Sequence, residues 1–435
     1  MSQIISFIHK IRTNRELLLV TLSQVVGLLS SILFIKLVSH YAAVEEYGLY
    51  SLVLSIAAFI ALFPFTSFDQ AISRYISIYH EDNNYHANYT SILFLYFLLI
   101  TALLILFAIF YPFLKPFIPD DILNVFDVLI IFSVLTIFRT TILQIENFNR
   151  NRMSVLYSRI FEGVTRILLL IFLVLYSSVS AYKILWIASI IFIVNIVWIL
   201  FYRRALLTPQ GLKLNLLKTN FKNYYRFSAP LLIWAVFSWL QLYAASWFLQ
   251  YYRSVEEVGY FTLLNTIALI VPAQVVGIIG TFIVPIMYQT ESTRNRYTRE
   301  KTKEIAIYLA LFFILIFVFM LFFHSFIVEI LSSSKYVAYS WLLPYLFLAA
   351  AFSNIAIIWT YEFFVHKKTK QLLLAQILPA FISILSCYFL IPVYGIIGAT
   401  VALLLTSVSY FILVVSTYYK FFTQLSHIKP NSFFV

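Results

Sequence analysis

The chain has 435 residues, of which 62% are hydrophobic and 11% are charged, and its formal net charge is +12. A soluble domain carries about 25% charged residues, so this composition excludes an ordinary soluble fold of this length. The apolar residues form long continuous runs and do not alternate with polar ones. This pattern excludes a membrane β-barrel and predicts an integral membrane protein built from helices.

The apolar runs predict twelve transmembrane helices, each close to the roughly 20 residues that cross a bilayer. Their approximate bounds are residues 16–39, 48–69, 91–112, 126–147, 154–176, 182–202, 228–249, 258–288, 304–326, 340–362, 371–391 and 396–419. The run 258–288 is long enough to tilt, or to bend at Pro272. The first run is too long for a cleavable signal peptide, so we expect it to remain as a span.

Lysine and arginine predict the orientation of these spans. With the N-terminus placed in the cytoplasm, the inner segments hold 23 of the 30 Lys and Arg residues, the outer segments hold four, and three lie within spans. The positive-inside rule therefore predicts that both termini are cytoplasmic. The basic loops would face the anionic inner leaflet, so the net charge requires no nucleic-acid partner.

The longest polar connection lies at the middle of the chain and predicts a division into two lobes. We expect an N-terminal six-helix lobe over 1–202, a cytoplasmic linker over 203–227, a C-terminal six-helix lobe over 228–419 and a cytoplasmic tail over 420–435. The single cysteine, Cys387, lies within a predicted span, which excludes a disulfide within the chain.

A short motif occurs once in each half. VEEYGLY begins at Val44 and VEEVGYF begins at Val255, 211 residues later. The same offset pairs Arg15 with Arg226, each just before the first span of its half. Because each half has an even number of spans, the two copies have the same orientation. We therefore predict parallel repeats related by an axis along the membrane normal.

The acidic pairs of this motif, Glu45 with Glu46 and Glu256 with Glu257, join the first span of each half to the second on the outer face. At the N-terminus of the second helix the macrodipole favours carboxylates, so one interpretation is that the pairs cap helices. The other is that they belong to an outer gate. Gly48, next to the first pair, would let a neighbouring helix approach closely.

Charged residues inside spans are candidates for function. Arg139 lies about twelve residues from either end of its span, roughly 16–18 Å from each flank at the helical rise, which is too far for easy snorkelling. It either serves a cavity or pairs with a carboxylate inside its lobe. Arg166 follows Glu162 by four residues, the favourable order for a helical ion pair, so a structural pair competes with substrate binding there.

Three further charges lie near span ends. Lys36 is close to the outer end of the first span and can reach the interface by snorkelling. Asp69 ends the second span, just before Arg74. Its carboxylate could be a proton or cation site coupled to turnover, or it could form a salt bridge at the cytoplasmic rim.

Three stretches of the chain carry a family resemblance. They are VEEYGLYSLVLSIAAFIALF with DQAISRYIS, FSAPLLIWAVFSWLQLYAASWFL with VEEVGYFTLLNTIALI, and IPVYGIIGATVALLLTSVSYF. Together they resemble the bacterial flippases of polysaccharide (O-antigen) repeat units, which belong with the multidrug and lipid II exporters in one superfamily. The resemblance implies two parallel six-helix lobes around a central cavity that opens alternately to each side of the bacterial inner membrane.

The resemblance also implies a cargo and its partners. The cargo would be an oligosaccharide on undecaprenyl pyrophosphate, used for lipopolysaccharide and moved from the inner to the outer leaflet by an ion gradient or the membrane potential. The implied partners are this lipid-linked cargo, membrane lipids, a polysaccharide polymerase and a chain-length regulator.

The related lipid II exporters carry cavity cations in their first, second and eighth spans. Lys36 and Arg74 match the first two, whereas the eighth span here has no Lys or Arg within its body. The candidate cargo-binding residues are Arg139, Arg74, Lys36 and Arg166.

Two other function classes stay open. A multidrug or small-cation exporter on the same scaffold should show acidic residues deep in its spans, whereas the deepest charge evident in the sequence is Arg139. A membrane polysaccharide polymerase or ligase should carry a sizeable outer loop, and every predicted outer loop is short. The sequence contains no phosphate-binding GxxxxGK[ST] motif and no His and Cys spacing typical of metal ligands, so we expect a transporter without cofactor or metal.

Overall fold

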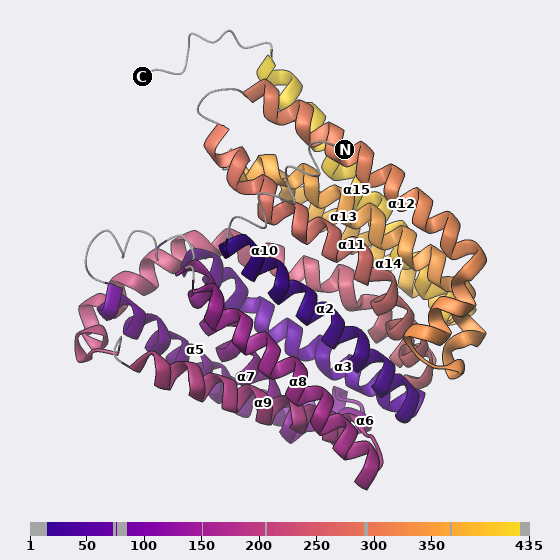
Figure 1. The fold of residues 1–435 in the computed structure, drawn as a ribbon, viewed down its shortest axis with the longest axis horizontal. Coiled ribbons are helices and arrows are strands. Elements are labelled where there is room, and N and C mark those ends of the chain that lie inside the picture. The colour runs from indigo at the N-terminus through magenta and orange to yellow at the C-terminus, as the bar shows by residue number, and fades with distance from the viewer. Residues whose placement is uncertain are drawn as a thin grey trace. The chain divides into compact units, whose positions relative to one another are not determined.

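The structure is a computed structural model that describes residues 15–72, 75, 85–149, 151–204, 207–290, 295–365 and 368–426. Every regular element in those residues is a helix, which confirms the predicted all-α membrane fold (Figure 1). The long helices are α2 (Arg15–Tyr41), α3 (Val44–Ile60), α5 (Tyr85–Leu114), α7 (Phe126–Phe148), α8 (Arg152–Tyr176), α9 (Ala181–Tyr202), α10 (Leu214–Tyr252), α11 (Val255–Thr290), α12 (Asn295–Leu331), α13 (Leu343–Val365), α14 (Leu373–Tyr394) and α15 (Ile396–Ser426). The short ones are η1 (Ala61–Thr66), η2 (Lys115–Phe117), α6 (Asp120–Leu123), η4 (Pro209–Leu212), η5 (Ser334–Leu342) and η6 (Thr369–Leu372).

Eleven helices in the described part of the chain are long and apolar enough to cross a membrane. The one predicted span not among these eleven is 154–176, which corresponds to α8 and differs from the others because α8 carries three arginines and a glutamate. Its 25 residues reach about 37 Å at the helical rise, enough to span the hydrocarbon core. Helix α8 therefore stays a predicted span, and its charges need partners within the protein.

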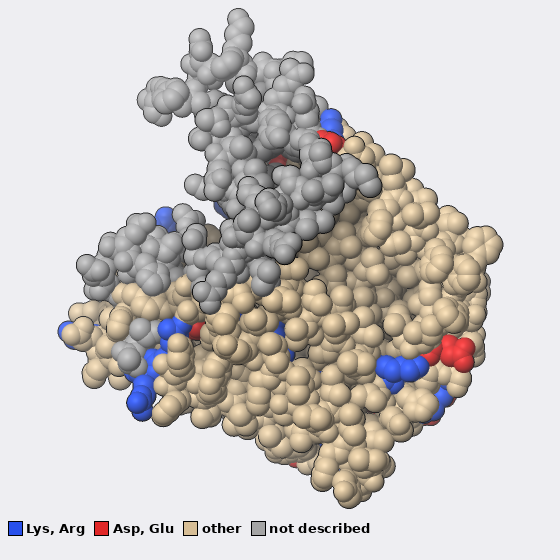
Figure 2. All heavy atoms as spheres, viewed as in Figure 1, with Lys and Arg blue, Asp and Glu red and all other residues tan. Residues whose placement is uncertain are grey.

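The surface of the helices fits a hydrocarbon environment. Large apolar side chains are widely exposed, including Leu175 at 72% and Phe322 at 77%. On the face drawn in Figure 2 most of the described surface is uncharged, and the charged side chains form small separate groups. A soluble protein exposing this much contiguous apolar surface would aggregate, so these faces are expected to contact lipid.

The chain divides into two compact units, residues 1–236 and 237–435, and the division falls within α10. It therefore lies later than the linker predicted at 203–227. The reason is that α10 already begins at Leu214, and its early residues Leu217, Asn220 and Tyr224 are buried in unit 1. These positions recur at three and four residues, which is the spacing of one helix face.

Polar contacts fix the early part of α10, and the loop before it, on α5. The Asn220 side-chain amide donates to the Asn88 Oδ1 at 2.8 Å and to the Ser91 Oγ at 3.0 Å. The Thr208 backbone N–H donates to the Thr90 hydroxyl at 2.9 Å. The predicted linker is therefore largely a packed part of unit 1. At the other end of the chain, α15 continues to Ser426, into the segment predicted as the tail.

Unit 1 is organised around pairs of neighbouring helices. Helix α2 packs along α8, α7 packs on α9, and α3 contacts both α7 and α9. Gly163 shows how closely α2 and α8 approach each other. A Cβ at Gly163 would lie 2.8 Å from the Ser30 Oγ and 2.9 Å from its Cβ. Small residues permit such close packing where helices meet without a hydrophobic driving force.

The second span of unit 1 is broken. Helix α3 ends at Ile60 and is followed by the irregular turn η1, in which Phe63 has non-helical dihedrals and precedes Pro64. Proline lacks the N–H of a helical ladder, which interrupts the backbone hydrogen bonds of the span at this point. Beyond the break, the Ser228 hydroxyl of α10 donates to the Ser67 carbonyl at 2.8 Å, and the Tyr96 hydroxyl lies 3.3 Å from the Phe65 carbonyl oxygen.

Unit 2 is organised around α13, which packs against α11, α12 and α15. The candidate span 334–364, which contains most of α13, is the most buried one in the described chain. Two thirds of its most apolar stretch lies inside the protein. Helices α14 and α15 form a tight hairpin that starts its second arm after Gly395. Gly395 has a φ of +53°, a conformation that favours glycine.

The helix boundaries repeat at the spacing of the duplicated motif. Helix α2 ends at Tyr41 and α10 ends at Tyr252, while α3 begins at Val44 and α11 begins at Val255, so both pairs are offset by 211 residues. The neighbours repeat as well, because α3 contacts α7 and α9 while α11 contacts α13 and α15. This shared order of packing supports the predicted duplication of a six-helix unit.

We predict that Gly398→Ala destabilises unit 2. A Cβ there would lie 2.4 Å from the backbone carbonyl oxygen of Leu390, and backbone cannot turn away as a side chain can. Overpacking of this kind costs about 1–3 kcal/mol, which should appear as a lower unfolding temperature in detergent. The control is Gly277→Ala on α11, where a Cβ meets nothing within 4 Å. Equal unfolding temperatures for the two variants would contradict the prediction.

Candidate functional site

Helix α8 concentrates charge on one face. Arg159, Glu162 and Arg166 are separated by three and four residues, so their side chains leave the helix in neighbouring directions. Charges at membrane depth are costly unless they are paired or hydrogen-bonded. The contacts of this face show how unit 1 meets that cost.

Glu162 is held at the junction of three helices. The guanidinium of Arg139 on α7 donates through Nε and Nη2 to both carboxylate oxygens. The side-chain amide of Asn195 on α9 donates to Glu162 Oε1 at 2.6 Å, and the Ser158 hydroxyl donates to Asn195 Oδ1 at 3.0 Å. The ring of Phe192 lies 4.8 Å from the Arg139 guanidinium carbon. The side chain of Glu162 is only 6% exposed, so its negative charge is balanced by Arg139 and not by solvent.

The local ion pair predicted between Glu162 and Arg166 is not the contact that the structure shows. Arg139 occupies both oxygens of Glu162, since its planar fork matches a carboxylate in two-point geometry. Arg166 instead turns toward α2, where its guanidinium carbon lies 5.3 Å from the centre of the Phe34 ring. Its Nε is buried and makes no hydrogen bond.

A second arginine of α8 also faces α2. The Arg159 Nη1 lies 3.2 Å from where a Cβ would stand on Gly27, so the absence of a side chain at that position makes room for the guanidinium. Together with Arg139, this part of unit 1 holds three arginines and one glutamate, an excess of two positive charges. Such a cluster can attract an anion and can donate several hydrogen bonds to it.

The other predicted cations are placed as follows. Lys36 lies on α2, partly buried and five residues before the end of that helix at Tyr41. Arg74 lies outside the described residues. The roles that we predicted for Arg139, Arg166, Lys36 and Arg74 in binding cargo stay predictions.

Asp69 is buried directly after the broken part of the second span. Its Oδ1 accepts hydrogen bonds from the Tyr96 hydroxyl at 2.6 Å and from the Thr141 hydroxyl at 3.0 Å. The predicted alternatives for Asp69 were a coupling site and a salt bridge at the rim with Arg74. Hydroxyl groups can solvate either a carboxylate or a carboxylic acid, so these contacts are compatible with a coupling site, which stays a prediction.

The helix α7 connects this carboxylate to the arginine cluster. Thr141 contacts Asp69, while Arg139, two residues earlier, contacts Glu162. Residues two apart on a helix point about 200° from each other, so the two contacts lie on opposite sides of α7. A displacement of α7 would therefore change both.

The duplicated acidic motif has a structural role that its position in the sequence did not reveal. Glu45 and Glu46 do lie in the first turn of α3, as predicted. However, a carboxylate oxygen of Glu46 accepts the backbone N–H of Ala181, the first residue of α9, at 2.6 Å. Glu46 thus binds the positive end of another helix.

The second copy has a similar position in unit 2, but without the backbone hydrogen bond. Glu256 and Glu257 lie in the first turn of α11, and Glu256 is exposed. A Cβ on Gly395, which precedes α15, would lie 2.5 Å from the Glu257 Oε2. The second glutamate of each motif therefore lies against the N-terminus of the last helix of its own unit. In unit 2, Arg253 adds hydrogen bonds to the carbonyls of Pro392 and Val393 at 2.8 and 2.9 Å.

One further buried pair was not predicted from the sequence. Glu146, near the end of α7, has a fully buried side chain and accepts from the Arg203 Nε at 3.0 Å and the Arg203 Nη2 at 2.8 Å. Asn151 donates to the same carboxylate at 2.9 Å. A signal was present, because Glu146 is an isolated acid at the end of an apolar run and Arg203 follows the end of another.

Comparison with known proteins identifies relatives of this architecture. Residues 14–291 match the family model described as "Polysaccharide biosynthesis protein". No curated protein matches the chain.

Solved structures match over nearly the whole chain. The lipid II flippase MurJ in an inward closed conformation is similar with a TM-score of 0.67 and 16% identity, over 96% of this chain and 93% of that one. An inward-facing multidrug resistance MATE family transporter of the MOP superfamily gives 0.66 and 11%, over 96% and 100%. A variant of the Vibrio cholerae MATE transporter VcmN gives 0.67 and 14%, over 93% and 96%. At these identities the similarity establishes the fold.

The Arg139–Glu162 pair predicts strong thermodynamic coupling. Glu162→Gln or Arg139→Met alone leaves a poorly hydrated charge without its partner and should cost about 3 kcal/mol of unfolding free energy. The double variant removes both charges and should cost clearly less than the sum of the two. The measurement is denaturant unfolding in detergent, with the exposed Arg204→Ala as a control for loss of a surface charge. Additive costs would show that the two groups do not stabilise each other.

The outer acids predict an unequal response within each pair. Glu46→Gln and Glu257→Gln remove a charge from a helix N-terminus and should each lower the unfolding free energy by about 0.3–1 kcal/mol. Glu45→Gln and Glu256→Gln are matched controls on exposed positions and should change it less. Should Glu46→Gln abolish activity while stability and protein level stay normal, the outer-gate interpretation would replace the capping one.

Proposed function

This chain belongs to the polysaccharide biosynthesis protein family, and on that premise we propose that it is a flippase for lipid-linked oligosaccharides. In this proposal it moves repeat units on undecaprenyl pyrophosphate from the inner to the outer leaflet of the bacterial inner membrane by alternating access. The fold, shared with flippases and exporters of the MOP superfamily, supports a transport role. The observation that carries the proposal is the cationic cluster inside unit 1.

The chemistry of the cargo explains why such a cluster is needed. A pyrophosphate must lose part of its hydration to enter a membrane protein, and guanidinium groups can replace water with charge-assisted hydrogen bonds. Arg159 and Arg166 are suited to this role because Arg159 lies against Gly27 and Arg166 lies against the ring of Phe34. Arg139 is engaged by Glu162, so its contribution to anion binding depends on that pair.

A driving force is available without nucleotide hydrolysis. The bacterial cytoplasm is electrically negative, so carrying an anion outward is downhill by about 2.3 kcal/mol per charge per 100 mV. The fixed arginines lower the cost of desolvating the anion and do not themselves cross the membrane. Asp69 offers a protonatable group in the same unit through which an ion gradient could act.

Asp69 also favours a second candidate function. A multidrug or small-cation exporter should hold a carboxylate deep in its spans, and Asp69 meets this in part, because it is buried in the protein but lies close to the end of the candidate span 44–72. A cation would have to tolerate the excess positive charge of the arginine cluster, which favours the flippase. Export of a lipophilic cation in vesicles, with no movement of a lipid-linked oligosaccharide, would favour the exporter.

The flippase proposal predicts the behaviour of single variants in a reconstituted flipping assay. Arg166→Ala should slow flipping by about tenfold or more, since hydrogen bonds to charged groups contribute about 1.5–3 kcal/mol. Arg166→Lys should retain part of the rate as a point charge without the fork. Arg204→Ala, which removes an exposed arginine, is the matched control and should flip normally.

The same assay tests the driving force. Collapsing the membrane potential with the pH gradient held fixed should slow the wild-type protein. Normal flipping by both Arg166→Ala and Arg159→Ala, at equal protein level, would remove the cluster from the cargo site. A rate that does not respond to the potential would remove the electrical driving force.

A further inference from the structure

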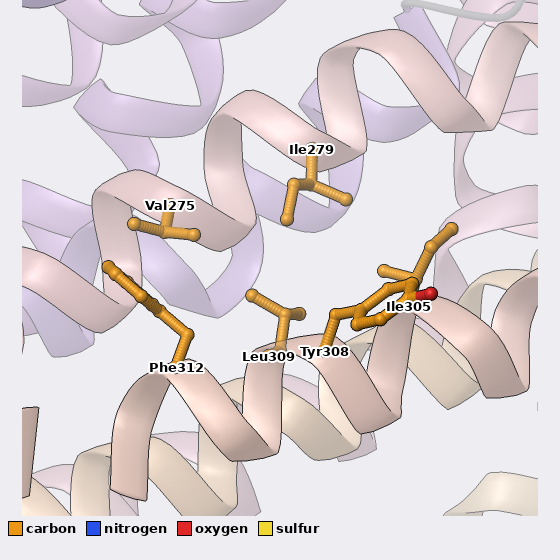
Figure 3. Close-up of a pocket in the computed structure, with 6 residues that line it drawn as sticks. All are labelled: Val275, Ile279, Ile305, Tyr308, Leu309 and Phe312. Atoms are coloured by element: carbon orange, nitrogen blue, oxygen red, sulfur yellow. The ribbon is translucent and has the colours of Figure 1, made fainter. Parts of the chain in front are cut away.

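Two apolar surfaces of the described chain differ in the ligand that they select. The first is a groove between α11 and α12, whose side chains face each other in Figure 3. Its lining residues are Val275, Ile279, Ile305, Tyr308, Leu309 and Phe312. None of these side chains carries a charge, so the groove selects no ligand beyond hydrocarbon. The second surface lies at the start of α10 and joins apolar side chains to cations.

An apolar stripe runs along the start of α10, beside its buried face. Leu214, Phe221 and Tyr225 fall within about 40° of one another around the helix, because each residue advances about 100°. Their side chains are 62%, 39% and 53% exposed. The centre of the Phe221 ring lies 6.0 Å from that of the buried Phe68 and 6.1 Å from that of Tyr225. The stripe is therefore anchored on the core of unit 1 and open on its outer side.

A basic stripe follows on the other side of the apolar one. Lys218, Lys222 and Arg226 recur every four residues and are exposed. Within the residues that the structure describes, none of the three forms an ion pair. No carboxylate is close in sequence either, since residues 163–255 contain no Asp or Glu. These charges are therefore available to an anion outside the chain.

The contacts between α10 and α5 place both stripes at one end of a membrane span. Asn220 is hydrogen-bonded to Asn88 and Ser91, in the first two turns of α5. The candidate span 85–113 of α5 has 29 residues, about 43 Å at the helical rise, which exceeds the hydrocarbon core by roughly 13 Å. Its terminal turns therefore reach the head groups, and the start of α10 lies at the same level.

This level favours lipid over a soluble partner. In an interfacial helix, apolar and aromatic side chains enter the boundary between head groups and acyl chains, while lysines beside them extend to the phosphates. The order of the faces around α10 matches this arrangement, because the apolar stripe separates the buried face from the lysines. This end of unit 1 is predicted to face the cytoplasm, where the leaflet is anionic.

We propose that the start of α10 binds anionic phospholipid of the inner leaflet. Leu214, Phe221 and Tyr225 enter the interface, while Lys218 and Lys222 bind the head-group phosphate. The site goes beyond the proposed function, because it does not depend on the cargo. It holds the first part of α10, the helix in which the chain passes from unit 1 to unit 2, at one depth in the membrane.

The first experiment tests whether the apolar stripe lies in lipid. The full-length protein, whose one cysteine is buried, receives a nitroxide at Phe221→Cys or Thr219→Cys and is reconstituted with phosphatidylethanolamine and phosphatidylglycerol. Oxygen concentrates in lipid, so it should relax the Phe221→Cys label more than a water-soluble nickel chelate does. The Thr219→Cys label should show the reverse, since Thr219 is exposed beyond the basic stripe.

The second experiment tests the lysines. A bimane at Asn215→Cys, an exposed position one turn from Lys218, is quenched by phosphatidylglycerol or phosphatidylcholine carrying a nitroxide at the top of one acyl chain. Phosphatidylglycerol should quench at the lower mole fraction. Lys218→Gln with Lys222→Gln should raise that mole fraction about 25-fold, because each lysine at the surface contributes about a factor of five.

Two further variants separate charge from folding. Lys218→Arg with Lys222→Arg should keep the preference for phosphatidylglycerol, because the charges remain. Lys115→Ala is the matched control and should also keep it, since Lys115 is exposed just beyond the other end of α5.

Three results would overturn the proposal. Equal access of the nickel chelate to the Phe221→Cys and Thr219→Cys labels would leave the stripe in water, open to a soluble partner. Equal quenching by the two phospholipids, or unchanged quenching in the double Gln variant, would remove the phosphate site. Displacement of phosphatidylglycerol by a tenfold smaller amount of undecaprenyl phosphate would assign the lysines to the carrier lipid instead.

Discussion

The ion pair between Arg139 and Glu162 determines how α7, α8 and α9 can meet. A carboxylate that is 6% exposed in a membrane span is stable only if its charge and lone pairs are satisfied within the protein. Two guanidinium nitrogens and the Asn195 amide provide this. With Glu162 satisfied by Arg139 of α7, Arg159 and Arg166 of α8 lie against α2. The pair thus makes Arg139 a structural cation. The two other cations lie elsewhere, Arg166 against the ring of Phe34 and Arg159 against Gly27.

The same electrostatic principle operates at the helix ends. Glu46 binds the N-terminus of α9, and the carboxylate of Glu257 lies beside the residue that precedes α15. In both units the first turn of the second helix thereby places a carboxylate beside the start of the last helix, and in unit 1 that carboxylate accepts a backbone N–H there. This common task explains why the acidic motif occurs twice at the same spacing as the helix ends. The first glutamate of each pair is exposed, so it is the second that lies against the last helix of each unit.

The features that could be predicted from sequence are those that local patterns determine. Continuous apolar runs predicted the spans, and the repeated motif predicted equivalent helix boundaries in the two units. The partner of Glu162 could not be predicted in this way, because Arg166 at four residues and Arg139 at 23 residues are both chemically suitable. Only the packing of α7 on α8 and α9 selects Arg139. The packed start of α10 could have been found, since Leu217 and Tyr224 follow one face of a helix, but the polar residues between them resemble a linker.

The two buried polar centres of unit 1 suit ions of opposite sign. The arginine cluster has an excess of two positive charges, so an anion that enters it relieves repulsion between guanidinium groups. Asp69 accepts hydroxyl donors from Tyr96 and Thr141, a setting that can take a proton or a cation. The contacts lie on opposite sides of α7, and a helix with its side chains is about 10–12 Å wide. That separation lets one unit hold an anion site and a protonatable site without direct neutralisation, while α7 remains in contact with both.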